Sequence, residues 1–178
     1  MRLRRATPAD LDFLVELYEN EDVLPFLAGG ARYDRETLRV ELARLEREPT
    51  AGAILVVDVD GEPAAALKWR LENERHRIAH LGALAVHPAF RGRHLADEAA
   101  RLLQRHLIVD LGFHRLQLEV YGFNERAMRH AERSGFVREG VKRKAYLRDG
   151  EWVDGVLYAL VEEDLAAAGT DAGKSGRP

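Results

Sequence analysis

The spacing of apolar residues predicts helices in four parts of the chain. In each part apolar residues recur every three or four positions, which gives a helix one apolar face. These stripes are Leu11, Leu14, Val15 and Tyr18; Leu38, Leu42 and Leu45; Leu95, Ala99, Leu102 and Leu103; and Ala127, Met128 and Ala131. Candidate N-caps precede three of the stripes, namely Thr7 (followed by Pro8), Asp34 and Asn124. Gly135-Phe136 is a typical end for the last helix.

Alternating apolar and polar residues predict strands in the rest of the chain. Residues 2–5 form a short strand that we place at an edge of the sheet. Residues 115–121 alternate between apolar and polar side chains, which places Glu119 and Tyr121 on a polar face. These two polar residues are therefore candidates for chemistry at this strand.

Turn residues divide the strand segments. Asp60-Gly61 predicts a tight hairpin between residues 54–59 and 64–69, and Asp149-Gly150 predicts a second hairpin near the end of the chain. We interpret residues 71–76 as a polar turn. Residues 20–33, with Gly29-Gly30, are expected to form a loop in which Phe26 and Tyr33 serve as packing residues.

The segment from His80 to Leu111 combines a strand, a turn rich in Arg and Gly, and a helix. Leu81 is out of phase with Leu84 and Val86, so we expect a β-bulge at Gly82 or Ala83 in this buried strand. After Pro88, cationic side chains stand before a helix N-terminus, where positive charge is unfavourable unless an anion binds. The turn therefore predicts an anion site.

Composition limits the kinds of function. The 178 residues suit one domain, expected to span 1–165, and the small polar tail 166–178 is expected to be disordered. A formal net charge of −3 does not favour binding to nucleic acid or to anionic membranes. The absence of cysteine excludes an acyl-cysteine intermediate and thiolate metal sites. With no signal-peptide pattern and no long apolar run, we expect a cytoplasmic protein.

The turn resembles the central motif of the GNAT superfamily of acyl-CoA-dependent N-acetyltransferases. The family pattern is Gln or Arg, two residues, Gly, one residue, then Gly or Ala, after a strand that ends like Leu-Ala-Val. Here Arg91 and Ala96 match the ends and Leu84-Ala85-Val86 matches the strand, while His94 stands in the place of glycine. NERAMRHAERSGF resembles a later family phrase, except that Ala131 replaces a tyrosine found in many members. The chain is most similar to the branch of ribosomal-protein N-terminal and polyamine acetyltransferases.

The resemblance implies the fold and a cofactor site. It implies a single α/β (α+β) domain with a mixed, mostly antiparallel central sheet flanked by helices. It also implies acetyl-CoA as co-substrate, without a metal, and a primary amine as acceptor, either a protein N-terminus or a small polyamine or amino-acid-like amine. The residues expected to bind the cofactor are Leu84, Ala85, Val86, Arg91, Gly92, Arg93, His94, Leu95, Ala96 and Asn124.

Catalysis would need a base for the amine, an oxyanion contact and an acid for the thiolate. The main-chain N–H of Leu84 is the expected oxyanion contact. His80 is the first candidate for the base because imidazole titrates near neutral pH, and Glu119 and Tyr121 are the alternatives. Tyr121 is also considered as the acid.

Other functional classes have less support in the sequence. Neither GxxxxGK[ST] nor GxGxxG nor GxSxG occurs, which argues against nucleotide folds and serine hydrolases. The second hypothesis is a non-catalytic module of the same fold that binds an acyl-CoA or a partner protein, and His94 and Ala131 favour it. An edge strand in the last hairpin could also support a homodimer.

Overall fold

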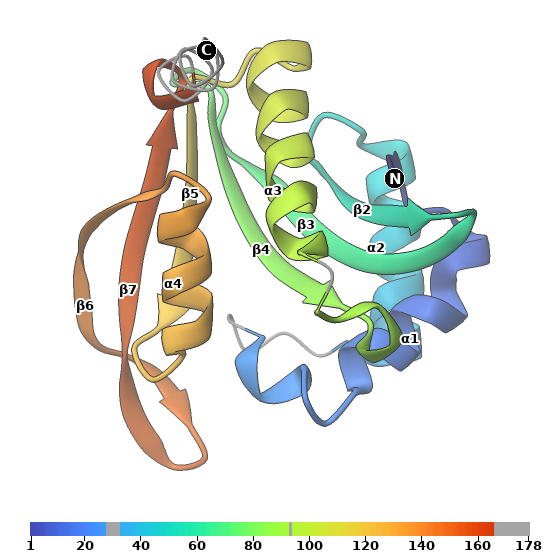
Figure 1. The fold of residues 1–178 in the computed structure, drawn as a ribbon, viewed down its shortest axis with the longest axis horizontal. Helices are drawn as coiled ribbons and strands as arrows, with labels where there is room; N and C mark the ends of the chain where they lie inside the picture. The colour runs from blue at the N-terminus through green and yellow to red at the C-terminus, as the bar shows by residue number, and fades with distance from the viewer. Residues whose placement is uncertain (28–32, 93, 166–178) are drawn as a thin grey trace, which may run out of the picture. The chain divides into compact units, whose positions relative to one another are not determined.

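The computed structural model describes residues 1–27, 33–92 and 94–165. Its seven strands form one mixed sheet in the order β1-β2-β3-β4-β5-β7-β6, with helices on its faces (Figure 1). The strands are β1 Arg2–Arg5, β2 Gly52–Val59, β3 Glu62–Asn73, β4 Ile78–Val86, β5 Arg115–Tyr121, β6 Val137–Arg148 and β7 Glu151–Val161. The helices are α1 Leu11–Glu19, α2 Arg35–Arg47, α3 Leu95–Arg105 and α4 Glu125–Arg133. The predicted fold class is confirmed, because β1–β2, β2–β3, β5–β7 and β6–β7 all pair antiparallel.

The described residues group into two compact units. The first unit contains residues 1–71 and 80–100, and the second contains residues 72–79 and the chain from Arg101 onward. The predicted tail 166–178 and Gly29-Gly30 lie outside the described residues.

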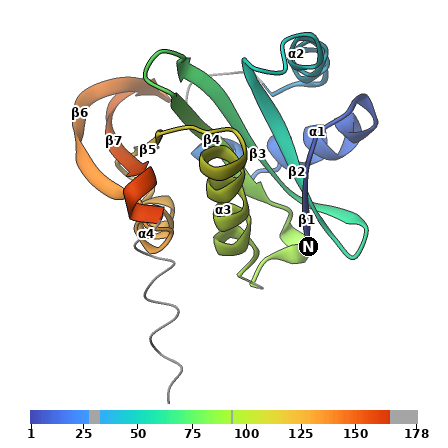
Figure 2. The ribbon, with the colours of Figure 1, turned by 90° about the horizontal axis from the view of Figure 1, so that it is seen from above.

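In the first unit, α1 and α2 cover one face of β2 and β3, and the first turns of α3 lie on the opposite face (Figure 2). The predicted cap Asp34 accepts a hydrogen bond from the Thr37 amide at 2.9 Å. The predicted stripe of α2 is buried, and α1 buries Leu17 in addition to its predicted face. The main core cluster of this unit is Leu14, Leu17, Tyr18, Val23, Leu27, Leu38, Leu42, Leu45, Ile54, Val56, Ala66 and Ala85.

The two aromatic residues of the predicted loop, Tyr33 and Phe26, differ in their exposure to solvent. Tyr33 packs against Tyr18, with 4.8 Å between the ring centroids, as expected for a packing residue. Phe26 is 48% exposed, so it does not belong to the core. It ends a short 3₁₀ turn, Leu24–Phe26, which has no buried residue.

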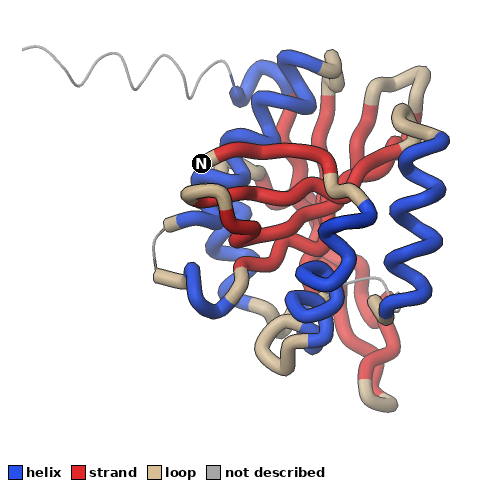
Figure 3. The backbone as a smooth tube through the Cα atoms, turned by 90° about the vertical axis from the view of Figure 1, so that its right-hand side faces the viewer, coloured by secondary structure: helices blue, strands red, loops and turns tan. Residues whose placement is uncertain are grey.

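The edge strand β1 begins at the N-terminus and pairs with β2 (Figure 3). Arg4 of β1 donates to both oxygens of Asp10 and to Asp58 of β2, at 2.7 to 2.8 Å. Asp10 lies in the 3₁₀ turn Pro8–Asp10 that follows the cap Thr7, and it is buried. Arg4 thereby ties the edge strand to the turn that starts α1.

The hairpin of β2 and β3 forms where Asp60-Gly61 predicts it. Both turn residues have positive φ, 53° and 89°, as a two-residue turn of this type requires. The prediction of a polar turn at 71–76 is wrong in its first half, because β3 continues to Asn73. The ladder is extended by the Leu71 amide, which donates to the Ala51 carbonyl at 2.8 Å. The turn itself follows at residues 74–77.

In the second unit, α4 lies against β5 and β7 (Figure 1). Tyr158 of β7 donates to Glu132 of α4 at 3.0 Å, and Ala131 on the same helix is buried. Gly135 ends the helix with φ +87°, and the Phe136 amide returns to the Ala131 carbonyl. The predicted cap and end of α4 are confirmed.

The last hairpin also forms as predicted. Asp149 and Gly150 both have positive φ, 49° and 85°, between β6 and β7. β6 lies at the edge of the sheet, and its pairing with β7 shifts register between Lys142 and Tyr146. Such a shift inserts extra residues in the edge strand and blunts it for pairing with another chain.

Candidate functional site

The turn after β4 has the backbone that an anion site requires. Gly92 and His94 both lie in the left-handed region, with φ of 78° and 55°, immediately before α3. The His94 carbonyl accepts from the amides of Asp97 and Glu98 at 3.1 and 3.2 Å, which starts the helix. The amides of Leu95 and Ala96 come before the first bonded amide, at the positive end of the helix dipole. This geometry suits a phosphate group.

His94 stands where the family motif has glycine, and its backbone shows why glycine is usual there. Its backbone adopts a conformation that favours glycine, because glycine has no Cβ to clash there. The imidazole is 92% exposed, with Nδ1 3.6 Å from an oxygen of Asp97. The histidine therefore costs backbone strain, while its ring extends into solvent.

Arg91 is held by an acidic partner that sequence analysis did not identify. Its guanidinium lies 2.8 Å from Asp22, which is in the loop after α1. Four residues earlier, His87, which directly follows β4, contacts Glu16 of α1 at 3.2 Å. A carboxylate thus occupies one face of the cation expected to meet the pyrophosphate. Arg93, the second expected cation, lies outside the described residues.

The strand β4 is irregular where the sequence predicts a bulge. Ala83 has φ +52°, which is incompatible with an extended pleat, and its carbonyl accepts from the Tyr18 hydroxyl at 3.1 Å. Burial of this hydroxyl raises the pKa of Tyr18 well above its usual value, so the phenol stays protonated as a donor. The irregularity is therefore confirmed in position, and the bulged pairing stays a prediction.

The buried side chains of β4 do not include all of its apolar residues. Ala79, Leu81 and Ala85 are buried, whereas Leu84 is 36% exposed and Val86 is only partly buried. Leu84 and Val86 lie outside the buried set, because the buried positions keep a period of two through the partly buried Ala83. Leu84 and the half-buried His80 thus lie on the opposite side of the strand from the core residues.

In the second unit, Asn124 serves as the cap of α4. Its side-chain oxygen accepts from the Ala127 amide at 3.0 Å, and the residue is buried. The local sequence explains this geometry, because asparagine is among the best N-cap residues. The pantetheine contact implied for Asn124 stays a prediction.

Glu119 of β5 is the centre of a cluster of polar side chains. Its two carboxylate oxygens accept from the Lys142 ammonium and from the Tyr146 hydroxyl, both on β6. Burial and this hydrogen bond raise the pKa of Tyr146 well above its ordinary value, so its hydroxyl remains a donor. The carboxylate is only 14% exposed, while the Lys142 side chain is 48% exposed. A shielded carboxylate with two donors is suited to holding a cationic group.

Tyr121 shares the polar face of β5 with Glu119, as predicted, but it is not accessible there. Tyr121 is 2% exposed because aromatic neighbours cover it: Phe123 stacks on it and Tyr146 meets it edge-on, each at 5.3 Å between centroids. Arg148 adds a cation 5.4 Å from its ring centre. Alternation along a strand gives the face of a residue, but neighbouring strands determine whether that face is open.

Sequence analysis missed Asp22, Lys142 and Tyr146, which contact expected site residues. The contacts join residues 69, 23 and 27 positions apart, so no local pattern encodes them. One signal was present in the sequence: Gly155, inside a strand, is a sign of close approach by another group. A Cβ built at Gly155 would come 2.5 Å from the Tyr146 ring.

The expected site residues are divided between the two units. The first unit holds His80, Leu84 to Val86 and the turn at 91–96, and the second holds Glu119, Tyr121 and Asn124. Among residues 1–27, 33–92 and 94–165, no group of three or more His, Asp or Glu side chains could hold a metal ion. Within the same described ranges, no helix is both long and apolar enough to cross a membrane.

Sequence comparison finds relatives among N-acetyltransferases. An uncharacterized N-acetyltransferase derived from the SPbeta prophage of Bacillus subtilis is 31% identical over 82 residues, 46% of this chain and 46% of that protein. Spermidine N(1)-acetyltransferase of Escherichia coli is 27% identical over 112 residues, 63% of this chain and 60% of that protein. The matched segments thus span about half to three fifths of these relatives.

Solved structures share the fold at low identity. Spermidine N-acetyltransferase from Vibrio cholerae, in complex with CoA and spermine, superposes with a TM-score of 0.81 at 20% identity, covering 93% of this chain and 97% of that one. Ribosomal-protein-S5-alanine acetyltransferase from Vibrio fischeri gives 0.78 at 17% identity, covering 92% and 93%. These similarities show a common architecture.

The sequence profile of the acetyltransferase (GNAT) domain matches residues 1–137, which include β1 to β5, α4 and the turn before α3. The match covers most of the chain and agrees with the fold. The chain therefore belongs to the acetyltransferase (GNAT) domain family.

Proposed function

We propose that this protein transfers an acetyl group from acetyl-CoA to a primary amine. The observation that carries the proposal is the turn before α3, where Gly92 and His94 take left-handed conformations beside Arg91 in a chain of this family. That turn presents helix N-terminal amides and a guanidinium to an anion, as the pyrophosphate of CoA requires. Its amides and those of Leu95 and Ala96 would hold the cofactor.

The acceptor is proposed to be a protein N-terminus or a small polyamine or amino-acid-like amine. The relatives whose names state an acceptor act on spermidine, and a structural neighbour acts on a ribosomal-protein alanine. All these acceptors present a primary amine that is an ammonium at neutral pH. The cytoplasmic location and the homodimer expected from the sequence also remain proposals.

The reaction would proceed by direct attack, because the chain has no cysteine to carry the acyl group. The neutral amine nitrogen attacks the thioester carbonyl, a C–N bond forms, and the C–S bond breaks. The amine proton leaves to a base, and the CoA thiolate takes up a proton. The main-chain N–H of Leu84, on the partly exposed side of β4, would stabilise the oxyanion.

Two side chains are proposed for the base. His80 on β4 is half-buried and lies on the same side of the strand as Leu84, which supports its assignment. Glu119 is the alternative, supported by its shielded carboxylate. Tyr121 is the least supported, because its phenol is buried beneath other rings. A pH–rate profile of His80→Ala would separate them: an unchanged profile would remove His80 and leave Glu119.

A second candidate function is a non-catalytic module that binds an acyl-CoA. Ala131 favours it, because many family members have a tyrosine there as the acid, and here a buried methyl group occupies the position. The two functions differ in one observable quantity, the release of free CoA. A binding module would retain the cofactor unchanged in the presence of amines.

The test is the initial rate of CoA release from acetyl-CoA with a panel of acceptors. A primary amine, an Ala-initiated peptide and a matched alcohol would be compared. We expect release with the amines only, and intersecting double-reciprocal lines, because both substrates must be bound together. Release that does not depend on an amine, or parallel lines, would contradict the proposal.

Arg91→Gln should raise the KM for acetyl-CoA about tenfold with little change in the KM for the amine, because a charge-assisted contact to phosphate is lost. Arg101→Gln removes a similar charge from an exposed position within α3, away from the turn, and is the matched control. Equal effects of the two substitutions would contradict a specific role for Arg91.

A further inference from the structure

The cluster around Glu119 is assembled by the register of three strands. β7 lies between β5 and β6, and Gly155 of β7 pairs with Tyr121 on one side and with Lys142 on the other. Directly paired residues share a face of a sheet. Glu119 pairs with Leu157 and Tyr146 with Val153, each two residues from Gly155 on β7. Glu119, Lys142 and Tyr146 therefore all project from one face.

Gly155 creates the space in which these side chains meet. A Cβ at this position would lie 2.5 Å from the Tyr146 ring and 3.6 Å from a carboxylate oxygen of Glu119. Without a side chain on the middle strand, groups from β5 and β6 can reach each other across β7. The opposite face of β7 is the one that meets α4, through Tyr158.

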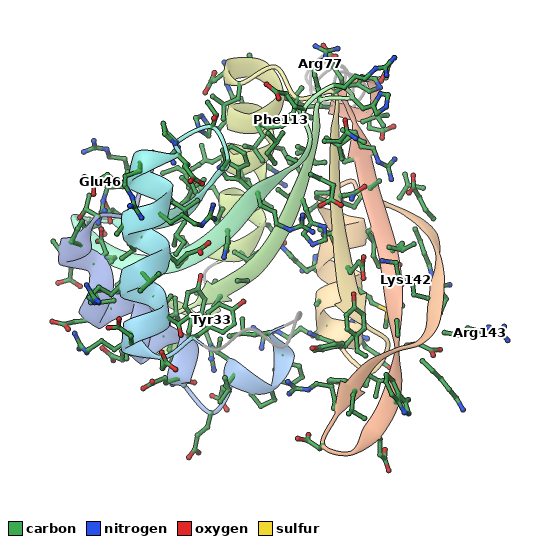
Figure 4. All side chains as sticks on the ribbon, turned by 180° about the vertical axis from the view of Figure 1, so that it is seen from behind. Tyr33, Glu46, Arg77, Phe113, Lys142 and Arg143 are labelled. Atoms are coloured by element: carbon green, nitrogen blue, oxygen red, sulfur yellow. The ribbon has the colours of Figure 1, made fainter. Side chains whose placement is uncertain are left out.

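The irregular edge strand brings Lys142 onto this face. The register shift between Lys142 and Tyr146 places Lys144 at φ +50°, and its amide donates to Asp154 at 2.7 Å. As a result, Lys142 lies against β7, whereas Arg143 beside it extends away from the strands (Figure 4). A neighbouring cation on the same strand is thus excluded from the cluster.

The contact of Lys142 has the chemistry of a bound amine. Its primary ammonium, on a flexible stem, donates to a carboxylate whose other oxygen is fixed by a phenol. The carboxylate is shielded and the lysine is much more exposed. If the ammonium moves away, a molecule from solvent can therefore reach the carboxylate at the position that the ammonium leaves. Because the lysine side is half exposed, water and other cations can compete with the ammonium for the carboxylate, which weakens the pair relative to a fully buried one.

We propose that Glu119 and Tyr146 form the ammonium subsite for the acceptor, and that Lys142 occupies this subsite when no acceptor is present. This inference rests on the proposed function, because only an acetyltransferase has an amine acceptor. Its test, however, measures amine binding and needs no acetyl transfer. Lys142 acts as an internal competitor that keeps the carboxylate paired and lowers the apparent affinity for amines. Acceptors must displace it, so the subsite selects primary ammonium groups with at least a short alkyl chain.

The test measures amine binding directly, without acetyl-CoA. The chain has four lysines, so ¹³C labelling of lysine gives few ε-CH₂ signals, and Lys142→Met identifies one of them by its loss. Titration of n-butylammonium at pH 7 should move the Lys142 signal saturably and leave that of Lys68, which pairs with Glu41, unchanged. Tetramethylammonium, which lacks N–H donors, should not displace Lys142.

Variants test each part of the subsite. Lys142→Met should bind n-butylammonium about two- to fivefold more tightly than wild type, because the internal competitor for the Glu119 carboxylate is removed. Glu119→Gln should abolish saturable binding, and Tyr146→Phe should weaken it while keeping the ring in place. Lys144→Met removes the same charge from the same strand and should bind as wild type does.

The outcomes separate this inference from the proposed function. Unchanged binding in both Lys142→Met and Glu119→Gln would overturn the subsite, even if the enzyme acetylates amines. Conversely, tighter binding in Lys142→Met would support the subsite even if no acetyl transfer were detected. Thermal unfolding of each variant verifies that a loss of binding comes from the subsite and not from unfolding.

Discussion

At the scale of single residues, the protein places side chains where the backbone favours glycine. His94 and Ala83 both have positive φ, one at the start of α3 and the other within β4. Each lies beside a residue expected to contact the cofactor or the oxyanion. Strain at such positions persists only where the surrounding structure imposes it, and it often marks a functional site.

Replacing His94 by glycine should stabilise the protein. His94→Gly removes a Cβ from the left-handed region, and we expect a gain of about 1 kcal/mol in the free energy of unfolding, partly offset by the entropy of glycine. Urea denaturation of wild type and variant measures the difference. His94→Ala keeps the Cβ and should not stabilise, so a gain of similar size in both variants would contradict the explanation.

Asp10 should make the protein sensitive to acid. The Arg4 guanidinium holds the pKa of Asp10 below its usual 3.8, so the ionised carboxylate favours the folded state. This stability is present above the unfolded pKa and is lost as the pH falls through the lower folded pKa. Asp10→Asn should cost about 2 kcal/mol at neutral pH, and the difference from wild type should shrink below the usual pKa.

Urea denaturation across this pH range tests the assignment. Asp12→Asn is the matched control, because Asp12 pairs with Arg35 at an exposed position and should contribute at most about 0.5 kcal/mol. An Asp10→Asn variant whose deficit stays constant from neutral to acidic pH would show that the carboxylate charge is not the source of stability.

At the scale of elements, local sequence predicts what local physics determines. The caps Asp34 and Asn124 and the turns at Asp60-Gly61 and Asp149-Gly150 all form as expected, because each depends on neighbours within four residues. The burial of Tyr121, in contrast, is not predicted by its local sequence. Its burial depends on Phe123 and on Tyr146 of a strand two positions away in the sheet, which alternation cannot reveal.

The β7 glycine should be intolerant of any side chain. Gly155→Ala introduces a Cβ 2.5 Å from the Tyr146 ring, so the ring must move away from Glu119. We expect a loss of about 1–3 kcal/mol, typical of overpacking, together with weaker binding of n-butylammonium. Thermal unfolding and the lysine NMR titration measure the two effects.

Gly140 of β6 provides the matched control. A Cβ built at Gly140 meets no atom within 4 Å, and the residue lies in the same hairpin. Gly140→Ala should therefore change neither stability nor amine binding by a measurable amount. If both alanine variants behaved alike, the close approach at Gly155 would not explain its effect.

At the scale of the whole molecule, the sequence predicts the order of the elements and the family. The strand ending in Leu84-Ala85-Val86, the turn at Arg91 and the Asn124 helix occur in the order that the family profile describes. What the sequence does not predict are contacts between distant segments. The Arg91–Asp22 and Glu119–Lys142 pairs depend on how loops and strand registers bring residues together, and neither partner is marked by a local pattern.

The proposed reaction moves an acetyl group from acetyl-CoA to a primary amine nitrogen. The most direct measurement uses acetyl-CoA labelled with ¹³C in the acetyl group, a primary amine acceptor and mass spectrometry of both products. We predict amine-dependent appearance of the labelled amide in equal amount to free CoA. Labelled acetate in place of the amide, or acetyl-CoA that remains intact in the presence of every primary amine, would contradict the account.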